Sequence, residues 1–249
     1  MPESADDIVT AGLLVIGDEI LSGRTKDRNI GTLADHLTAI GIDLREVRVV
    51  ADDEGAIVEA VQALSGRYTY VFTTGGIGPT HDDITTDAVG KAFGVPVDVD
   101  PRAVAVMKPA YEKRGLELTP ARLRMARLPA GADLISNGVS AAPGFMIGNV
   151  IVLAGVPAIM RAMLDAATQH LRTGSKVNSV SIVLERPEAE IAELFAAHQG
   201  EYPDISMGSY PSFVEGKYRT ELVLRGRNPG LLEQALAGLE SKLAANQSR

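Results

Sequence analysis

Three apolar runs, each followed by a turn and an amphipathic segment, occupy the chain up to Gly94. The three segments are residues 9–16, 44–50 and 68–74, which we interpret as strands; the first is a nearly continuous apolar run of the kind found in buried parallel strands. Apolar residues recur at helical spacing after each run, as Ile30, Leu33 and Leu37 do after the first. Strands that alternate with helices form right-handed βαβ units, so this pattern predicts an α/β fold built on a parallel sheet.

The turns that follow the three runs are expected to meet at one edge of that sheet. They begin at Gly17, Asp52 and Gly75. In parallel sheets, ligands bind beyond the carboxyl ends of the strands, which is where these turns lie. The sequence therefore predicts one shared site made from all three turns.

The alternation changes beyond Phe93. The sequence predicts a helix from Pro101, a basic helix after Thr119-Pro120 and a hairpin within residues 145–153. A boundary is expected near residues 173–175, between a domain at residues 8–172 and a small α/β subdomain at residues 175–246 with the order β-α-β-β-α. The basic helix carries Arg122, Arg124 and Arg127, which form either a solvated face or a source of one phosphate ligand.

Charge and composition exclude several classes of partner. The formal net charge of −8 argues against nucleic acid or a membrane surface as a partner, because both attract basic patches. The chain has no cysteine, and no apolar stretch approaches the roughly 20 residues that span a bilayer. Residues 1–7 are polar and acidic, unlike a signal or transit peptide. We therefore expect a cytoplasmic enzyme or binding protein.

The third turn contains several glycines, and acidic residues follow them. Gly75, Gly76 and Gly78 let a backbone approach a ligand closely, and the following segment resembles a helix start, where unpaired N–H groups attract anions. The motif lacks the Lys-Ser/Thr of a P-loop and the spacing of a dinucleotide fold. From spacing alone, a tight turn with an acidic helix cap and a phosphate site are equally good interpretations.

Acidic residues accompany all three turns. Asp18 and Glu19 follow the first strand, Asp53 the second, and Asp82 and Asp83 the third. Hard carboxylates of this kind suit Mg²⁺ or Mn²⁺, which bridge to phosphates. The hydroxyls of Ser22, Thr80 and Thr85 are candidate phosphate contacts. The alternatives are that Asp53 only caps its helix, that Glu19 is a solvated loop charge and that His81 is a plain helix-start residue.

Taken together, these segments resemble a known family. The pattern comprises Gly17-Asp18-Glu19-Ile20-Leu21-Ser22-Gly23, Asn29, Asp53, and the run from Gly75-Gly76-Ile77-Gly78-Pro79-Thr80 through His81-Asp82-Asp83-Ile84-Thr85. Further matches lie at residues 128–132, 142–145, 154–157 and 208–213. The pattern covers residues 9–243 and resembles the molybdopterin-binding (MoaB/MogA-like) domain, in the variant found at the N-terminus of CinA-type proteins and of FAD synthases.

The resemblance implies a three-layer α/β/α fold with a mostly parallel sheet, assembled as a dimer or trimer. It implies a pyrophosphatase that depends on a divalent metal (Mg, Mn or Co) and hydrolyses an ADP-containing nucleotide such as ADP-ribose or FAD. The alternatives are a non-catalytic molybdopterin- or nucleotide-binding protein and a molybdopterin adenylyltransferase. The residues up to Arg249 do not match the deamidase domain of CinA or the adenylyltransferase domain of FAD synthase, so we expect any activity of this sequence to come from the molybdopterin-binding-like domain.

On this interpretation, Asp82 and Asp83 hold the metal, and Asp83, Asp82, Asp53 and Asp18 form the catalytic group. The remaining site residues would bind the ligand and its phosphates. They are Gly17, Glu19, Ser22, Asn29, Gly75, Gly76, Gly78, Pro79, Thr80 and Thr85.

Overall fold

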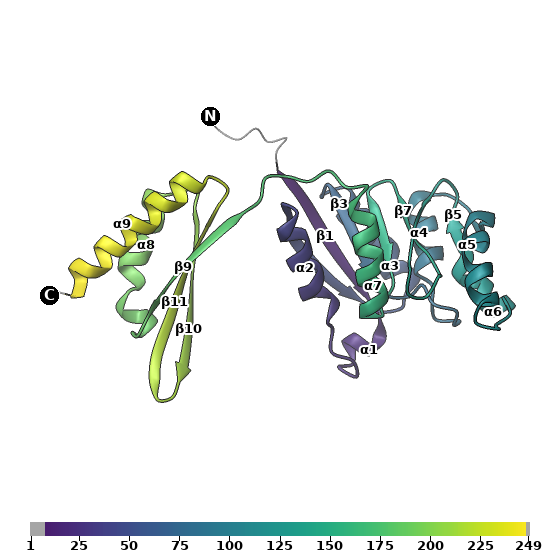
Figure 1. Ribbon diagram of the computed structural model, residues 1–249, viewed down its shortest axis with the longest axis horizontal. Helices are drawn as coiled ribbons and strands as arrows, with labels where there is room; N and C mark the ends of the chain where they lie inside the picture. Colours follow the sequence, from purple (N-terminus) through teal and green to yellow (C-terminus); the bar gives the residue numbers. More distant parts are fainter. Residues whose placement is uncertain (1–7, 248–249) are drawn as a thin grey trace. The chain divides into compact units, whose positions relative to one another are not determined.

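A computed structural model describes residues 8–247 of the chain, so the acidic N-terminal residues 1–7 lie outside the described part. The chain divides into two compact units between Gly174 and Ser175. Each unit has its own sheet and its own buried core (Figure 1). The two units are described separately below.

The first unit is built on a six-stranded sheet with the order β2-β1-β3-β8-β7-β6. Strands β1 (Val9–Ile16), β2 (Ile42–Val50), β3 (Tyr70–Thr74) and β8 (Val150–Leu153) are parallel neighbours. Strand β7 (Gly144–Ile147) is antiparallel both to β8 and to β6 (Asp133–Ile135). Only β7 therefore opposes the other strands, and the predicted mostly parallel sheet is confirmed.

Helices cover both faces of this sheet. On one face, α3 (Glu54–Ser65), α4 (Thr85–Phe93) and α5 (Pro101–Glu112) pack on a core that includes Leu14 and Ile16 of β1. On the other, α2 (Asn29–Ala39) and α7 (Pro157–Thr168) pack on a core that includes Leu13 and Val15. Because successive side chains of a strand point to opposite faces, β1 contributes to both cores. The first unit is therefore a three-layer α/β/α structure (Figure 1).

The predicted basic helix is wrong in part. Helix α6 (Pro120–Leu123) passes into the 3-10 turn η2 (Arg124–Ala126), and Arg127 opens strand β5 (Arg127–Pro129). The ladder between β5 and β4 (Val97–Val99), in which Arg127 lies opposite Val99, ends the helical segment. The three arginines consequently belong to three different elements.

The strand order identifies where a ligand should bind. From β1 the chain passes to β2 on one side, and β3 then pairs with β1 on its other side. The reversal leaves a crevice beyond the carboxyl ends of β1 and β3, which is the usual ligand position in open α/β sheets. The turns at Gly17 and Gly75 border this crevice.

The second unit has the order strand, helix, strand, strand, helix. Its antiparallel sheet has the order β10-β11-β9, formed by β9 (Asn178–Leu184), β10 (Ser206–Val214) and β11 (Lys217–Gly226). Turn η3 (Glu188–Glu190) and helix α8 (Ala192–Glu201) follow β9, and α9 (Pro229–Gln247) closes the unit. Leu222 and Leu224 of β11 lie in the core beneath the helices.

Strand β10 is an edge strand, and the β10–β11 hairpin continues to a turn in which Glu215 and Gly216 both have positive φ. The Met207 amide, near the start of β10, donates to Gln199 Oε1 of α8 (2.8 Å). Four residues later Pro211 has no amide to donate. The free edge of β10 thus lacks two of its regularly spaced donors.

Candidate functional site

The glycine turn after β3 can be made only by glycine at its first two positions. Gly75 has a φ of 106°, and a Cβ there would lie 2.1 Å from the Ile16 carbonyl oxygen. Gly76 has a φ of 65°, and a Cβ there would lie 2.2 Å from Thr85 Oγ1. The turn therefore lies directly against the end of β1 and brings backbone into the crevice.

Thr85 holds this turn in place and is not free to bind phosphate. Its side chain is completely buried, and Oγ1 donates to the Gly75 carbonyl (3.0 Å). Its backbone amide donates to the Gly76 carbonyl (3.0 Å). The prediction that Thr85 contacts a phosphate is corrected accordingly, because its hydroxyl proton already satisfies a buried carbonyl.

The acidic segment forms a braced loop, and helix α4 begins only at Thr85. The Thr80 amide donates to Asp83 Oδ2 (2.8 Å), and the Thr80 hydroxyl donates to the same oxygen. The Asp83 carboxylate also packs against Gly78, because a Cβ on Gly78 would lie only 2.5 Å from Asp83 Oδ2. Asp83 thus folds back onto the Gly78–Thr80 backbone and shapes the loop from inside.

Asp82 faces solvent beside this loop. Its side chain is 64% exposed, and the Thr80 hydroxyl beside it already donates to Asp83. His81 is almost fully exposed, with Nδ1 3.9 Å from Asp82 Oδ1, and Pro79 is also exposed. Asp82 is therefore an anion at neutral pH that a ligand or cation can reach.

The loops after β1 and β2 are joined by one hydrogen bond. The Asp18 amide, which opens the short helix α1 (Asp18–Leu21), donates to Asp52 Oδ2 (2.9 Å). Burial raises the pKa of Asp52, and repulsion from the carboxylates of Asp18, Glu19 and Asp82 raises it further. The carboxylates of the loops after β1 and β3 therefore lie close enough to Asp52 to act on it electrostatically.

Asp52, and not Asp53, is the residue of the second loop that faces the site. Asp53 is the N-cap of α3, where its Oδ1 accepts from the Ala56 amide (2.8 Å). This is the alternative role that the sequence left open for Asp53. The sequence signal was two adjacent aspartates after a strand, of which only one can cap the helix.

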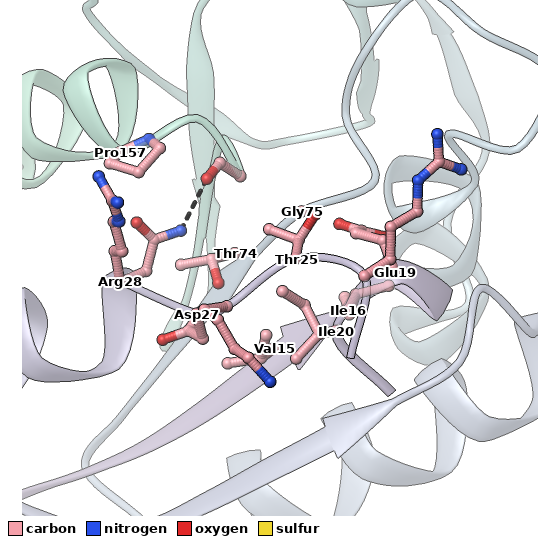
Figure 2. A pocket seen from close by; sticks show the side chains of 14 residues that line it. Val15, Ile16, Glu19, Ile20, Thr25, Asp27, Arg28, Thr74, Gly75 and Pro157 are labelled. Carbon is pink, nitrogen blue, oxygen red and sulfur yellow. Dashed lines mark hydrogen bonds between the residues drawn. The ribbon is translucent and has the colours of Figure 1, made fainter. Parts of the chain in front are cut away.

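A pocket of about 500 Å³ opens beside the acidic loops (Figure 2). It includes Glu19 from the first loop and Gly75 from the third, so it adjoins both. Asn29 lies at its wall, where its Nδ2 donates to the Gly155 carbonyl (2.8 Å). Ser22 is exposed and does not line this pocket. The basic residues of its rim, Arg24, Lys26 and Arg28, were missed because a charged loop carries no periodic signal.

Of the three arginines, Arg124 lies next to the acidic loop. Its Nη2 donates to the Asp83 carbonyl (3.4 Å), and its Nε is buried without a hydrogen-bond partner. Arg127 instead forms a two-bond pair with Asp87 (2.8 and 2.6 Å), and Arg122 stacks over Tyr111. One arginine thus brings positive charge to the loop that carries Asp82.

The carboxylates fit a metal that arrives together with phosphate. Within residues 8–247, no group of three or more Asp, Glu or His side chains converges as a ready set of metal ligands. Mg²⁺ commonly takes one or two carboxylates and completes its coordination with phosphate oxygens and water. Asp82 and Asp18 offer carboxylates of that kind on neighbouring loops, without a protein cage.

Both units of the chain match known protein families. Residues 12–173 match the probable molybdopterin binding domain, and residues 176–248 match the middle domain of FAD synthase. None of the helices within residues 8–247 is long and apolar enough to cross a bilayer.

Individual relatives show the same two-part pattern. A CinA-like protein of Desulfosudis oleivorans is 34% identical over 82% of this chain, and a probable FAD synthase of Caenorhabditis elegans is 32% identical over 95% of it. The chain spans about half of each, 52% and 50%. The crystal structure of CinA from Thermoplasma acidophilum covers 66% of this chain and 98% of its own, with 36% identity and a TM-score of 0.60.

Proposed function

The chain belongs to the molybdopterin-binding domain family, and on that premise we propose that it is a divalent-metal-dependent pyrophosphatase acting on an ADP-containing nucleotide of the ADP-ribose or FAD class. The observation that carries the proposal is the meeting of carboxylates from three strand ends beside a glycine turn and a pocket. The name of the matched second region, the FAD synthase middle domain, supports a nucleotide with an adenylate half.

We assign different tasks to two carboxylates of the site because their surroundings differ: Asp52 is partly buried, whereas Asp82 faces solvent. Burial raises the pKa of Asp52, so its carboxylate is a stronger base than an ordinary one and suits removal of a proton from the attacking water. Asp82 is exposed to solvent and, like an ordinary aspartate, is anionic at neutral pH beside the phosphates. Asp82, with Asp18, would hold a metal that neutralises the pyrophosphate and orients it for attack.

In the proposed reaction, water attacks one phosphorus of the pyrophosphate, the bridging P–O bond breaks and the water proton passes to Asp52. ADP-ribose would give AMP and ribose 5-phosphate, and FAD would give AMP and FMN. The Gly75–Gly76 backbone approaches the phosphates, and Arg124 balances charge on the group that leaves. Asp83, which the sequence predicted to hold the metal and to belong to the catalytic group, shapes the loop through Thr80 in this proposal.

The test is a screen of Mg²⁺, Mn²⁺ and Co²⁺ against ADP-ribose, FAD, NAD and CoA, with AMP measured by mass spectrometry. We expect AMP from ADP-ribose or FAD, and a loss of kcat of at least about 100-fold in Asp52→Asn. Asp53→Asn is the matched control, because asparagine caps a helix as well as aspartate does. The proposal fails if no metal supports turnover, or if both variants lose activity equally.

A second candidate function is binding of a pterin or nucleotide without hydrolysis. The lack of a preformed group of three metal-ligand side chains within residues 8–247 favours it. It predicts stoichiometric complexes that mass spectrometry recovers unchanged. A molybdopterin adenylyltransferase would instead form a new product only when ATP and a pterin are present together. The cytoplasmic location and the dimer or trimer remain expectations, and light scattering of the full chain tests the latter.

A further inference from the structure

A second pocket, of about 400 Å³, lies in the second unit between η3, α8 and β10. Most of its lining is apolar and comes from Ala189, Ala192, Phe195, Ala196 and Met207. Cavities of this size and character receive a small molecule or an anchoring side chain of another protein. The proposed reaction makes no use of this pocket.

The polar side chains at this pocket are already engaged within the unit. The Gln199 side chain accepts from the Met207 amide (2.8 Å) and donates to the Ile205 carbonyl (2.7 Å). The Ser209 hydroxyl donates to Glu188. An occupant would therefore gain little from hydrogen bonds there and more from burying apolar surface.

The tip of the β10–β11 hairpin, residues 211–219, carries an exposed pair of aromatic side chains. Every residue of the tip is exposed, and the hairpin extends beyond α8 and α9 in Figure 1. Phe213 is 62% exposed and Tyr218 59%, and their rings meet edge to face with centroids 4.9 Å apart. Single exposed apolar residues are common, but an aromatic pair on a projecting hairpin is typical of a surface that contacts a partner.

The pocket and the tip lie on one face of the sheet. In the antiparallel register Ser209 lies opposite Leu222 and Phe213 opposite Tyr218. Because side chains alternate between faces, Ser209, Pro211 and Phe213 all point to the face that carries the Leu222 core. Phe213 lies four residues beyond Ser209, about 13 Å along an extended strand, so it cannot enter the pocket of its own chain. The aromatic tip and the apolar pocket can therefore meet only between two copies.

We propose that two copies of the chain associate by exchanging these hairpin tips: the Phe213 side chain of each copy enters the 400 Å³ pocket of the other, beside Phe195 and Met207. Ser209 and Phe213 lie two residues on either side of Pro211. Two antiparallel hairpins that cross at Pro211 consequently place each Phe213 over the other pocket at once. The contact is isologous, because the same residues are used twice about a two-fold axis.

Charge favours this exchange. The segment that borders the pocket carries acidic residues and no cation, namely Glu188, Glu190 and Glu193. The tip carries Lys217 and Arg219 against Glu215. Lys217 lies 3.6 Å from Glu185 of its own chain, but both side chains are more than two-thirds exposed, so this pair contributes little. The exchange brings each cationic tip to an acidic rim.

Sedimentation velocity of the full chain over a concentration series measures the association. Wild-type protein should show a monomer–dimer equilibrium. Phe213→Ser should raise the dimer Kd at least about 100-fold, because each dimer loses two buried aromatic side chains. Val214→Ser is the matched control: Val214 is the next residue, is 52% exposed and points to the opposite face, so the Kd should stay within about twofold.

The pocket is tested by filling it. Ala196→Leu places a larger side chain in the lining and should raise the dimer Kd at least about tenfold. Ala197→Leu is the control, because Ala197 is also exposed on α8 but does not line the pocket. All the substituted positions are exposed, so the variants should keep the stability of the wild type, which thermal unfolding followed by circular dichroism measures.

A mixture of the two defective variants distinguishes the exchange from other contacts. Phe213→Ser has an intact pocket and Ala196→Leu an intact tip, so a mixed dimer recovers one of the two contacts that each homodimer lacks. With one variant labelled, fluorescence-detected sedimentation should show a mixed dimer that forms at least about tenfold more tightly than either homodimer.

Several results would overturn the exchange. The wild-type chain could stay monomeric throughout the series or have the mass of a trimer, and Phe213→Ser could dimerise as the wild type does. Loss of association in Phe213→Ser but not in Ala196→Leu, or a mixture that fails to associate, would show that the tips do not enter the pockets. Hydrolysis of ADP-ribose is measured separately by AMP release, so the proposed reaction and the exchange stand or fall independently.

Discussion

The buried hydroxyl of Thr85 provides a test of how the glycine turn is held. Thr85→Val replaces Oγ1 by a methyl group of nearly the same size, 3.0 Å from the Gly75 carbonyl oxygen. That carbonyl loses its donor, which costs about 1–3 kcal/mol of unfolding free energy for a buried group. A methyl carbon also needs about 3.3 Å or more from an oxygen, so the turn must move.

Thr85→Ser is the matched variant, because it keeps the hydroxyl and removes only a buried methyl group, at about 1 kcal/mol. Urea unfolding followed by circular dichroism measures both losses. Release of AMP from ADP-ribose then separates them: Val should lower kcat/KM at least about tenfold, and Ser should leave it within about twofold. If Val is as stable and as active as the wild type, the hydroxyl does not hold the turn and the reasoning is refuted.

Three further predictions concern the same crevice. Gly75→Ala should lower the free energy of unfolding by at least about 2 kcal/mol, because the new Cβ would collide with the end of β1. Gly94 also has a positive φ but lies in open space, so Gly94→Ala should lower it by only about 1 kcal/mol. Urea unfolding measures both values. The pKa of Asp52 is raised in the folded state, so ionisation of this carboxyl destabilises the fold. The stability of the wild type relative to Asp52→Asn should therefore fall as the pH rises from below about 3.9 through the folded-state pKa. In thermal unfolding between about pH 3 and 7, the melting temperatures of the two proteins should agree at the acid end and diverge as the pH rises. Arg124→Gln should lower kcat/KM at least about tenfold, and Arg122→Gln, whose guanidinium stacks over Tyr111, should not; equal effects would show that neither serves the site.

The fold was largely predictable because its determinants are periodic. The apolar run of β1 supplies side chains to both cores, and the helical stripes after it allow few arrangements other than a parallel sheet. The position of the crevice followed, since parallel strands end together. Glycines at positive φ in the third turn were likewise visible as residue types.

The tasks of individual polar residues were less predictable. Asp52 and Asp53 are adjacent and chemically identical, and only the local geometry shows which one caps α3 and which accepts from Asp18. Thr85 carries a hydroxyl that could bind a phosphate, but that hydroxyl donates a hydrogen bond to the Gly75 carbonyl, ten residues earlier. Such assignments depend on which backbone groups remain unpaired after folding, and residue spacing does not contain that information.

The free edge of β10 has a consequence for the behaviour of the protein at high concentration. An exposed edge strand is a template on which another chain can add a strand and begin an aggregate. Here the Met207 amide is occupied by Gln199, and Pro211 offers no donor, so an incoming strand would find an interrupted ladder. These two interruptions disfavour strand addition at an edge that also exposes Phe213.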